Sequence, residues 1–164
     1  MFDITSKNLL VKAASAIKTR IVLGQTEMHF PEFSRKKFLL TATDTYEEAR
    51  EVLVKNRKSD YHKYFAYPIA EALLNLQKQR AVRPFTLFDE PSNPKILQGR
   101  RSCDAARIFS HDQYNFVQTM TWHQIAVGFD VANLSGTSGK QFVVYERRES
   151  ECEEDSPWRI CYVS

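Results

Sequence analysis

The stretch that most constrains this chain is residues 43–83, where the spacing of apolar side chains predicts two successive helices. Asp44 followed three residues later by Glu47 is the pattern of a helix capping box, so we expect the first helix to begin there. Three basic residues stand where this helix is expected to end: Lys55, Arg57 and Lys58. Because positive charge is favourable near a helix C-terminus, we interpret them as complements to the helix dipole, with ligand binding as the alternative.

The second helical segment covers residues 60–80 and carries one apolar stripe at helical spacing. The stripe consists of Tyr61, Phe65, Ile69, Leu73 and Leu76. Because proline suits the first turn of a helix better than its interior, we expect the main helix to begin near Pro68, after a separate turn at residues 61–67. One kinked helix is the alternative. Rings and cations mixed in this turn suit stacking on nucleic-acid bases, but rings are so often buried that we expect them in the core.

The flanking segments predict a further helix and several short strands. Residues 7–23 are expected to form a helix that stops at Gly24. Its buried face is predicted to consist of Leu10, Ala14, Ile17 and Ile21. Residues 38–43 are predicted as a short strand, and residues 85–88 and 95–99 as a hairpin around a turn rich in Pro, Asn and acidic residues. The order of these elements over residues 7–100 resembles that of a winged-helix arrangement, which leaves residues 101–164 as a helix plus a β-hairpin.

The next part of the chain gives mixed signals. Ser102 and Ser110 are candidate helix N-caps, so helices are expected after each. Residues 119–131 fit either the continuation of a helix or a β-branched strand, and both alternatives stay open. Gly128 is expected to end this element.

Residues 141–146 and 158–163 are the clearest strands. We expect them to pair antiparallel across an acidic loop, because their apolar and polar residues alternate. The buried members are expected to be Val144, Trp158 and Ile160. Together these elements predict an α+β fold: a single compact domain over residues 1–164, with N-terminal helices, short antiparallel strands and a C-terminal β-hairpin.

The composition is that of a folded protein of ordinary size. A chain of 164 residues can bury a hydrophobic core without disulfide or metal cross-links. Its 43% hydrophobic and 26% charged residues are usual in globular proteins. We expect no membrane contact, because the sequence has neither an apolar run long enough to span a bilayer nor a secretory signal. The three cysteines lack C-x-x-C spacing and predict free thiols in a cytoplasmic protein, with a bridge between Cys152 and Cys161 as the alternative in an oxidising compartment.

Charge is distributed unevenly along the chain. Residues 1–145 contain 20 Lys/Arg and 14 Asp/Glu, a net charge of +6, and residues 146–164 contain 3 and 6, a net charge of −3. We therefore expect a non-enzymatic regulatory protein whose basic side binds nucleic acid or another macromolecule. The residues expected to contact phosphates are Arg35, Lys36, Lys37, Arg57, Lys58, Lys63, Arg100 and Arg101. An inhibitor whose basic patch meets an acidic protein surface is an alternative.

A small hydrolase is the remaining alternative. Histidine acts as a general acid or base near neutral pH, so the candidate catalytic residues are His111, Asp112 and His123. Residues 136–140 look like part of a phosphate loop, but the first glycine and the Ser or Thr after the lysine are missing. We therefore expect no cofactor and no metal site. The sequence does not indicate an oligomeric state.

Overall fold

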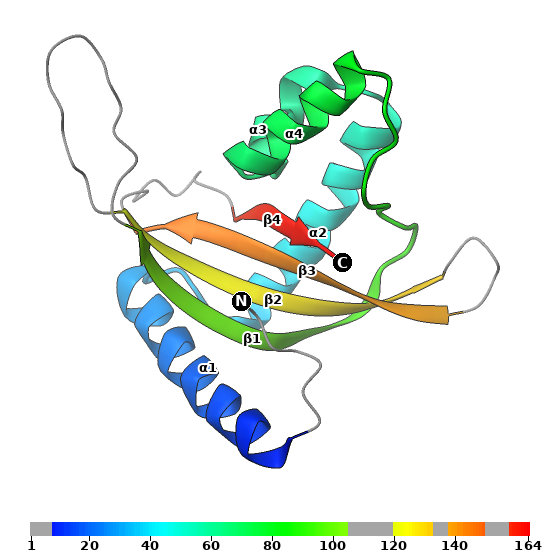
Figure 1. Cartoon of the computed structure of the whole chain (residues 1–164). Coiled ribbons are helices and arrows are strands. Elements are labelled where there is room, and N and C mark those ends of the chain that lie inside the picture. Colours follow the sequence, from blue (N-terminus) through cyan, green and yellow to red (C-terminus); the bar gives the residue numbers. More distant parts are fainter. Residues whose placement is uncertain (1–7, 105–119, 133–137, 150–157) are drawn as a thin grey trace, which may run out of the picture.

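Helices occupy the first half of the chain and a sheet the second half. The computed structural model describes residues 8–104, 120–132, 138–149 and 158–164. The helices are α1 (Leu9–His29), α2 (Arg35–Val54), α3 (Tyr61–Tyr64) and α4 (Tyr67–Lys78), with a 3₁₀ turn, η1 (Lys58–Asp60), before α3. One antiparallel sheet contains, in this order, β1 (Ser92–Asp104), β2 (Met120–Ala132), β3 (Ser138–Arg148) and β4 (Arg159–Val163) (Figure 1). The predicted α+β class, with helices before strands, is confirmed.

Successive residues of β2 alternate between the two faces of the sheet. The face that α1 and α2 cover, called here the helix face, buries His123, Ile125, Val127, Phe129 and Val131. The opposite face, called here the outer face, carries the partly exposed Trp122, Gln124, Gly128 and Asp130. The strand register extends this alternation across the sheet, because Arg100, Gln124 and Glu146 lie side by side, as do Arg101, His123 and Arg147.

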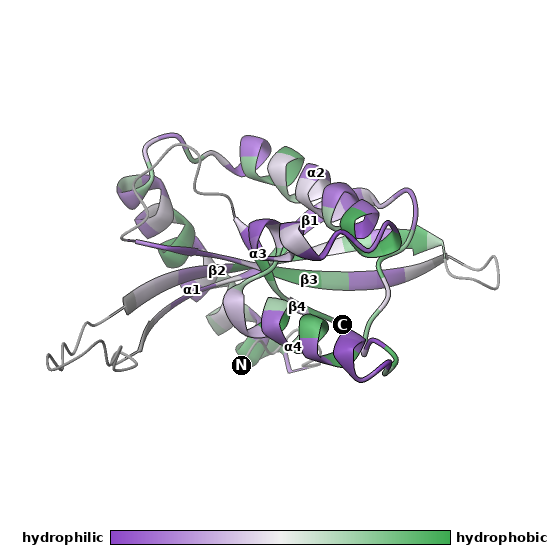
Figure 2. Cartoon of the chain, turned by 90° about the horizontal axis from the view of Figure 1, so that it is seen from above, coloured by the Kyte–Doolittle hydropathy of each residue, from purple (hydrophilic) through white to green (hydrophobic). Residues whose placement is uncertain are grey.

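Helix α2 supplies most of the helix-face core. Its buried residues are Phe38, Ala42, Thr45, Tyr46, Ala49, Val52 and Leu53. The Tyr46 hydroxyl donates to Gln141 Oε1 at 2.6 Å, and the Tyr145 hydroxyl donates to the Ala42 carbonyl at 2.6 Å. Both phenols are fully buried, so these bonds avoid the cost of about 1–3 kcal/mol for an unsatisfied buried polar group. Seen from above, β3 is hydrophobic in its middle, where it meets this core (Figure 2).

Helices α3 and α4 lie beyond β4. Phe65 forms a parallel bridge with Ile160, and Ala66 N donates to the Ile160 carbonyl at 2.8 Å. Pro68 lies in the first turn of α4, so the prediction of a main helix that begins near Pro68 after a separate turn is confirmed. Tyr61 and Phe65 are fully buried, as predicted for that turn, whereas Tyr67 is 63% exposed.

Helix α1 packs along β1 through a narrow face (Figure 1). Its buried residues are Thr19, Val22, Leu23 and Thr26. Gly99 permits this close packing, because a Cβ at that position would lie 3.2 Å from Val22 Cγ1. The Gly99 amide donates to Thr19 Oγ1 at 3.2 Å, which satisfies one of the hydroxyls on the buried side.

The buried face predicted for α1 is wrong. Leu10, Ile17 and Ile21 are 79%, 61% and 56% exposed, and Ala14 is exposed as well. Hydrogen bonds explain the difference. Thr26 bonds to the Val22 carbonyl and Thr19 to the Gly99 amide, so these two threonines can face the sheet in place of the more hydrophobic stripe. The helix also continues through Gly24 to His29.

Helix α2 corrects two further predictions. It begins after Ser34, whose hydroxyl accepts from Lys37 N at 3.2 Å, and not at Asp44. Residues 38–43, predicted as a strand, therefore belong to α2. Phe38, Ala42 and Tyr46 are buried four residues apart, which is the spacing of a helix face.

Strand β1 replaces the hairpin predicted at residues 85–88 and 95–99. Residues 85–88 are not a strand, and residues 95–99 pair with β2. Ser102 lies within β1 and caps no helix. The order of elements compared with a winged-helix arrangement is therefore not the order in the structure. The helix predicted after Ser110 lies outside the described residues.

The strands in the C-terminal half agree better with the predictions. Residues 120–132 form a strand, one of the two alternatives, and Gly128 lies within it, facing Leu97. β3 and β4 pair antiparallel as predicted, and the expected members are buried: Val144 at 1%, Trp158 at 5% and Ile160 at 0% exposure. Cys161 is a free thiol, so it is not bridged to Cys152. Cys152 itself and the side chain of Cys103 lie outside the described part of the chain.

Candidate functional site

The basic residues predicted to bind a partner do not form one cluster. Arg35, Lys36 and Lys37 begin α2, whereas Arg57 and Lys58 follow its end. A helix of 20 residues is about 30 Å long at about 1.5 Å per residue, so these two groups lie at opposite ends of α2. Lys63 lies in α3, and the remaining two arginines lie in β1.

Several of these cations already have acidic partners. Arg35 Nε lies 4.0 Å from Glu27 Oε1, and Arg57 lies 3.9 Å from Glu51 and 3.7 Å from Asp60. Each such exposed ion pair stabilises the fold by about 0–1 kcal/mol, so these pairs do not prevent the same cations from binding another anion. Arg100 and Arg101 point to opposite faces of the sheet, because they are adjacent in a strand.

The outer face of the sheet is hollowed beside the start of α4. A cavity of about 520 Å³ is lined there by Pro68, Ile69, Arg100, Gln124, Phe142, Val144, Cys161 and Tyr162, among others. A second cavity of about 220 Å³ is lined by residues that include His62, Tyr67, Trp122, Arg148 and Arg159. Ala66 and Glu146 line both cavities, so the two adjoin. We call them together the outer-face groove.

Arginines and aromatic rings line this groove together. The Arg148 guanidinium lies 4.7 Å from the centre of the Trp122 ring, a cation–π contact, and the rings of Phe142 and Tyr162 stack with their centres 5.9 Å apart. Tyr162 is 52% exposed. Glu146 is the acidic member, and its Oε2 accepts from Gln124 Nε2 at 3.2 Å. The groove therefore offers positive charge and ring faces to the same ligand.

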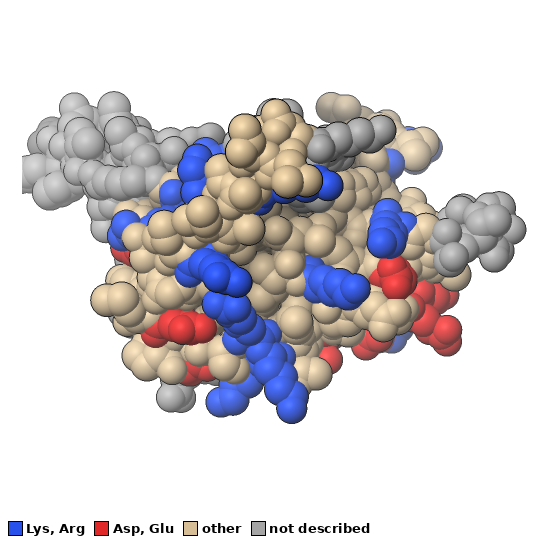
Figure 3. Space-filling view, turned by 90° about the horizontal axis from the view of Figure 1, so that it is seen from below, with Lys and Arg blue, Asp and Glu red and all other residues tan. Residues whose placement is uncertain are grey.

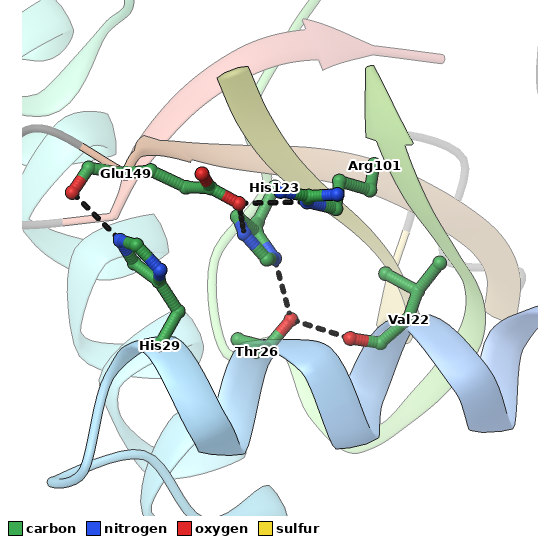
Figure 4. Close-up of polar contacts among 6 residues, drawn as sticks. All are labelled: Val22, Thr26, His29, Arg101, His123 and Glu149. Atoms are coloured by element: carbon green, nitrogen blue, oxygen red, sulfur yellow. Dashed lines mark hydrogen bonds and ion pairs between the residues drawn. The ribbon is translucent and has the colours of Figure 1, made fainter. Parts of the chain in front are cut away.

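A separate polar cluster joins α1 to the ends of β2 and β3 (Figure 4). The ring of His123 contacts Thr26 Oγ1 through Nδ1 and Glu149 Oε1 through Nε2, both at 2.8 Å. Arg101 Nε donates to the same Glu149 oxygen at 2.7 Å, and His29 Nε2 lies 2.8 Å from the Glu149 carbonyl. The helix α1, the strands β1 and β2 and the end of β3 are thus linked through Glu149 and His123.

The protonation of the polar cluster follows from these contacts. The hydrogen bond from Arg101 lowers the pKa of Glu149 to about 2, against the opposing effect of burial. Burial lowers the pKa of His123 below its ordinary value, although Glu149 opposes this. Because an ionised carboxylate can only accept, Nε2 of His123 carries the hydrogen that points to Glu149.

A hydroxyl, an imidazole and a carboxylate in sequence have the order of a catalytic triad. Thr26 and His123 are each 0% exposed, however, so a substrate cannot reach the hydroxyl in this arrangement. His123, one of the candidate catalytic residues, therefore serves to connect helix and sheet. His111 and Asp112, the other two, lie outside the described residues.

Most residues of the outer-face groove are not predictable from the sequence as members of one site. Trp122, Arg148 and Arg159 come from three strands, and they share a site only because of the register in which β2, β3 and β4 pair. Alternation within each strand was the available signal, but it does not say which strands are neighbours.

The described residues contain no helix that is long and apolar enough to cross a membrane. Within the same ranges, no group of three His, Cys, Asp or Glu side chains is placed to hold a metal ion. Comparison with known proteins adds no assignment: no family model matches the chain, and no curated protein matches it either.

Proposed function

We propose that the protein is a non-enzymatic regulatory binding protein that engages single-stranded nucleic acid through the outer-face groove. The observation that carries the proposal is the convergence of Arg100, Arg148 and Arg159 with Trp122 and Tyr162 on one hollowed face. Among the described residues that line the two cavities, Glu146 is the one carboxylate, so the balance of charge favours an anion.

The combination of groups favours a single strand over a duplex. Arginine forms bidentate hydrogen bonds with phosphate oxygens, and exposed rings stack on bases of any sequence. A duplex keeps its base faces inside its own stack, so the rings would find no partner there. The groove thus matches both the backbone and the bases of an unpaired strand.

The test compares two double variants that remove the same charge. Arg148→Gln/Arg159→Gln removes two positive charges from the groove, and Lys36→Gln/Lys37→Gln removes two from the exposed start of α2. Fluorescence anisotropy with a labelled oligothymidylate should show weaker binding for the groove variant only. Its slope of log affinity against log salt should flatten by about 0.7 for each phosphate that the variant no longer binds.

The ring contribution is tested separately. Trp122→Ala should weaken binding of the single strand by about 1–3 kcal/mol while changing the salt slope little. Absence of binding by the unaltered protein at ~50 mM salt, where electrostatic association is strong, would overturn the proposal. Equal weakening by both double variants would move the site to the N-terminus of α2. Displacement of the strand by polyglutamate with no dependence on Trp122 would favour an acidic protein partner instead.

A further inference from the structure

Helix α1 presents its more hydrophobic side to solvent. The exposed residues include Leu10 at 79%, Ile17 at 61%, Ile21 at 56% and Met28 at 85%. The side that packs on the sheet contains two threonines among its four buried residues. An apolar stripe turned outward in this way has no role in the core, and contiguous exposed apolar surface marks an interaction site.

We propose that this stripe is a docking surface for an amphipathic helix of a partner protein that carries acidic residues beside its own apolar stripe. The spacing of the stripe gives the first reason. Leu10, Ala14, Ile17, Ile21, Gly24 and Met28 follow one another at alternating intervals of four and three residues. This is the pattern of the a and d positions of a coiled coil, the positions that meet a second helix.

Gly24 gives an independent reason. Glycine in the middle of a helix is destabilising relative to alanine. A Cβ added at Gly24 would meet nothing within 4 Å, so the fold itself does not require glycine there. At Gly99, by contrast, the packing of Val22 leaves little room for a Cβ, which would lie 3.2 Å from Val22 Cγ1. A glycine on the stripe allows the backbone of a second helix to approach closely.

The charges beside the stripe specify the partner. In the heptad pattern the charged residues at the e and g positions that flank the seam are Lys18, Arg20 and Glu27, all of them exposed. Glu27 already has a cationic neighbour, because Arg35 Nε lies 4.0 Å from its Oε1, so Lys18 and Arg20 are the charges left for a partner. Seen from below, the side on which α1 lies, the molecule shows a band of Lys and Arg, with Asp and Glu toward its edges (Figure 3). Acidic flanking residues on the partner helix would complement these cations.

A second copy of the chain fits the charges less well. Antiparallel pairing of two α1 helices in the central register would bring Lys18 against Lys18 and Arg20 against Arg20, and like charges at such positions are destabilising. A register shifted by one heptad would set Arg20 against Glu27, but the carboxylate of Glu27 is already paired with Arg35. Parallel pairing would place Ala13 and Gln25 opposite them, which supplies no acid. The flanking charges therefore point to a different, acidic helix.

The test uses two synthetic helical peptides with the same apolar seam, one with Glu and one with Lys at all e and g positions. The full chain should bind the Glu peptide at least tenfold more tightly than the Lys peptide, as measured by fluorescence anisotropy. Ile17→Ser/Ile21→Ser should abolish binding. Lys18→Glu/Arg20→Glu should reverse the preference between the peptides.

Gly24→Leu separates docking from folding. Its side chain has open space in the isolated protein, so the melting temperature should not fall, but binding of the Glu peptide should weaken at least tenfold. Equal affinity for both peptides, or no binding of the Glu peptide, overturns the proposal. Two further outcomes assign the stripe to another occupant and also overturn the proposal. They are dimerisation in sedimentation and binding to phosphatidylserine vesicles, if either is lost in Ile17→Ser/Ile21→Ser while the Glu peptide does not bind.

Discussion

Helices α1 and α2 have nearly the same length, 21 and 20 residues, and cover the same face of the sheet, yet they are attached by different physical means. α2 buries seven residues, among them Phe38, Tyr46 and Leu53. α1 buries four, and two of these are threonines held by hydrogen bonds. Helix α2 therefore contributes to the core mainly through apolar burial, whereas α1 buries only Val22 and Leu23 beside its hydrogen-bonded threonines and keeps most of its apolar residues on the surface.

A substitution in α2 should have the greatest effect on stability. Phe38 is 2% exposed and its ring packs edge-on against Tyr145 and Trp158, with centroids 6.0 and 5.0 Å away. Phe38→Ala should lower the free energy of unfolding by about 3–5 kcal/mol, because it removes buried apolar area and leaves a cavity. Urea denaturation measures this. A decrease below about 1 kcal/mol would show that α2 is not the apolar anchor described above.

The attachment of α1 should depend on pH. The pKa of His123 is lower in the folded protein than in the unfolded chain, so its contribution to stability is present above the ordinary value of 6.5 and is lost as the pH falls below it. Glu149 has a folded pKa of about 2 against an ordinary value of 4.5, so a second decrease in stability follows between these values. This second decrease is at most about 3 kcal/mol.

Denaturation at pH 7.5, 5.5 and 3.5 would measure both decreases, with about 1 kcal/mol as the resolvable difference. Glu149→Gln should reduce the lower-pH decrease, because glutamine does not titrate, whereas Glu32 and Glu51, whose pKa values are also lowered by hydrogen bonds, remain. A stability profile that is flat from pH 7.5 to 5.5 would contradict the assignment of His123.

A pair of glycine substitutions should have opposite signs. Gly24→Ala should stabilise the protein by about 0.5–1 kcal/mol, because alanine favours the helix and its Cβ meets nothing within 4 Å. Gly99→Ala should destabilise it, because the Cβ would press on Val22 at 3.2 Å. Thermal melting of the two variants measures both signs. A destabilising Gly24→Ala would mean that the outer side of α1 is covered in the free protein.

A substitution on the exposed stripe should change stability least. Ile17→Ala should alter the free energy of unfolding by less than about 0.5 kcal/mol, because the side chain is 61% exposed. The matched control is Phe38→Ala in α2, measured in the same urea series. If Ile17→Ala cost as much as a core substitution, the distinction between the two helices would fail.

Local signals in the sequence predicted the elements that depend on few neighbours. Pro68 predicted where α4 begins, and the alternation of residues 158–163 predicted a strand paired with β3. The buried side of α1 was not predictable from hydrophobicity, because Thr26 is accepted into the core through bonds to Val22 and His123 that come from tertiary structure. Residues 38–43 look β-like only until Ser34 is recognised as the start of a longer helix.

The candidate site was less predictable than the fold. Of the basic residues expected to act together, Arg100 alone is among the described residues that line the outer-face groove. Arg148 and Trp122 meet because β2 and β3 pair in one particular register. A shift of that register by one residue would move either side chain to the helix face, and no local pattern specifies it.

The contact between Thr26 and His123 couples the protonation of β2 to the hydrogen bonding of α1. The Thr26 hydroxyl has a single hydrogen to donate, but its oxygen lies 2.8 Å from two acceptors, the Val22 carbonyl oxygen and Nδ1 of His123. When the ring is neutral with its hydrogen on Nε2, the hydroxyl can donate to either acceptor. When the ring takes up a proton at Nδ1, that nitrogen becomes a donor and the hydroxyl can donate only to the Val22 carbonyl. One proton entering β2 thereby fixes the direction of a hydrogen bond within α1, so the protonation of the sheet is read at the end of this helix.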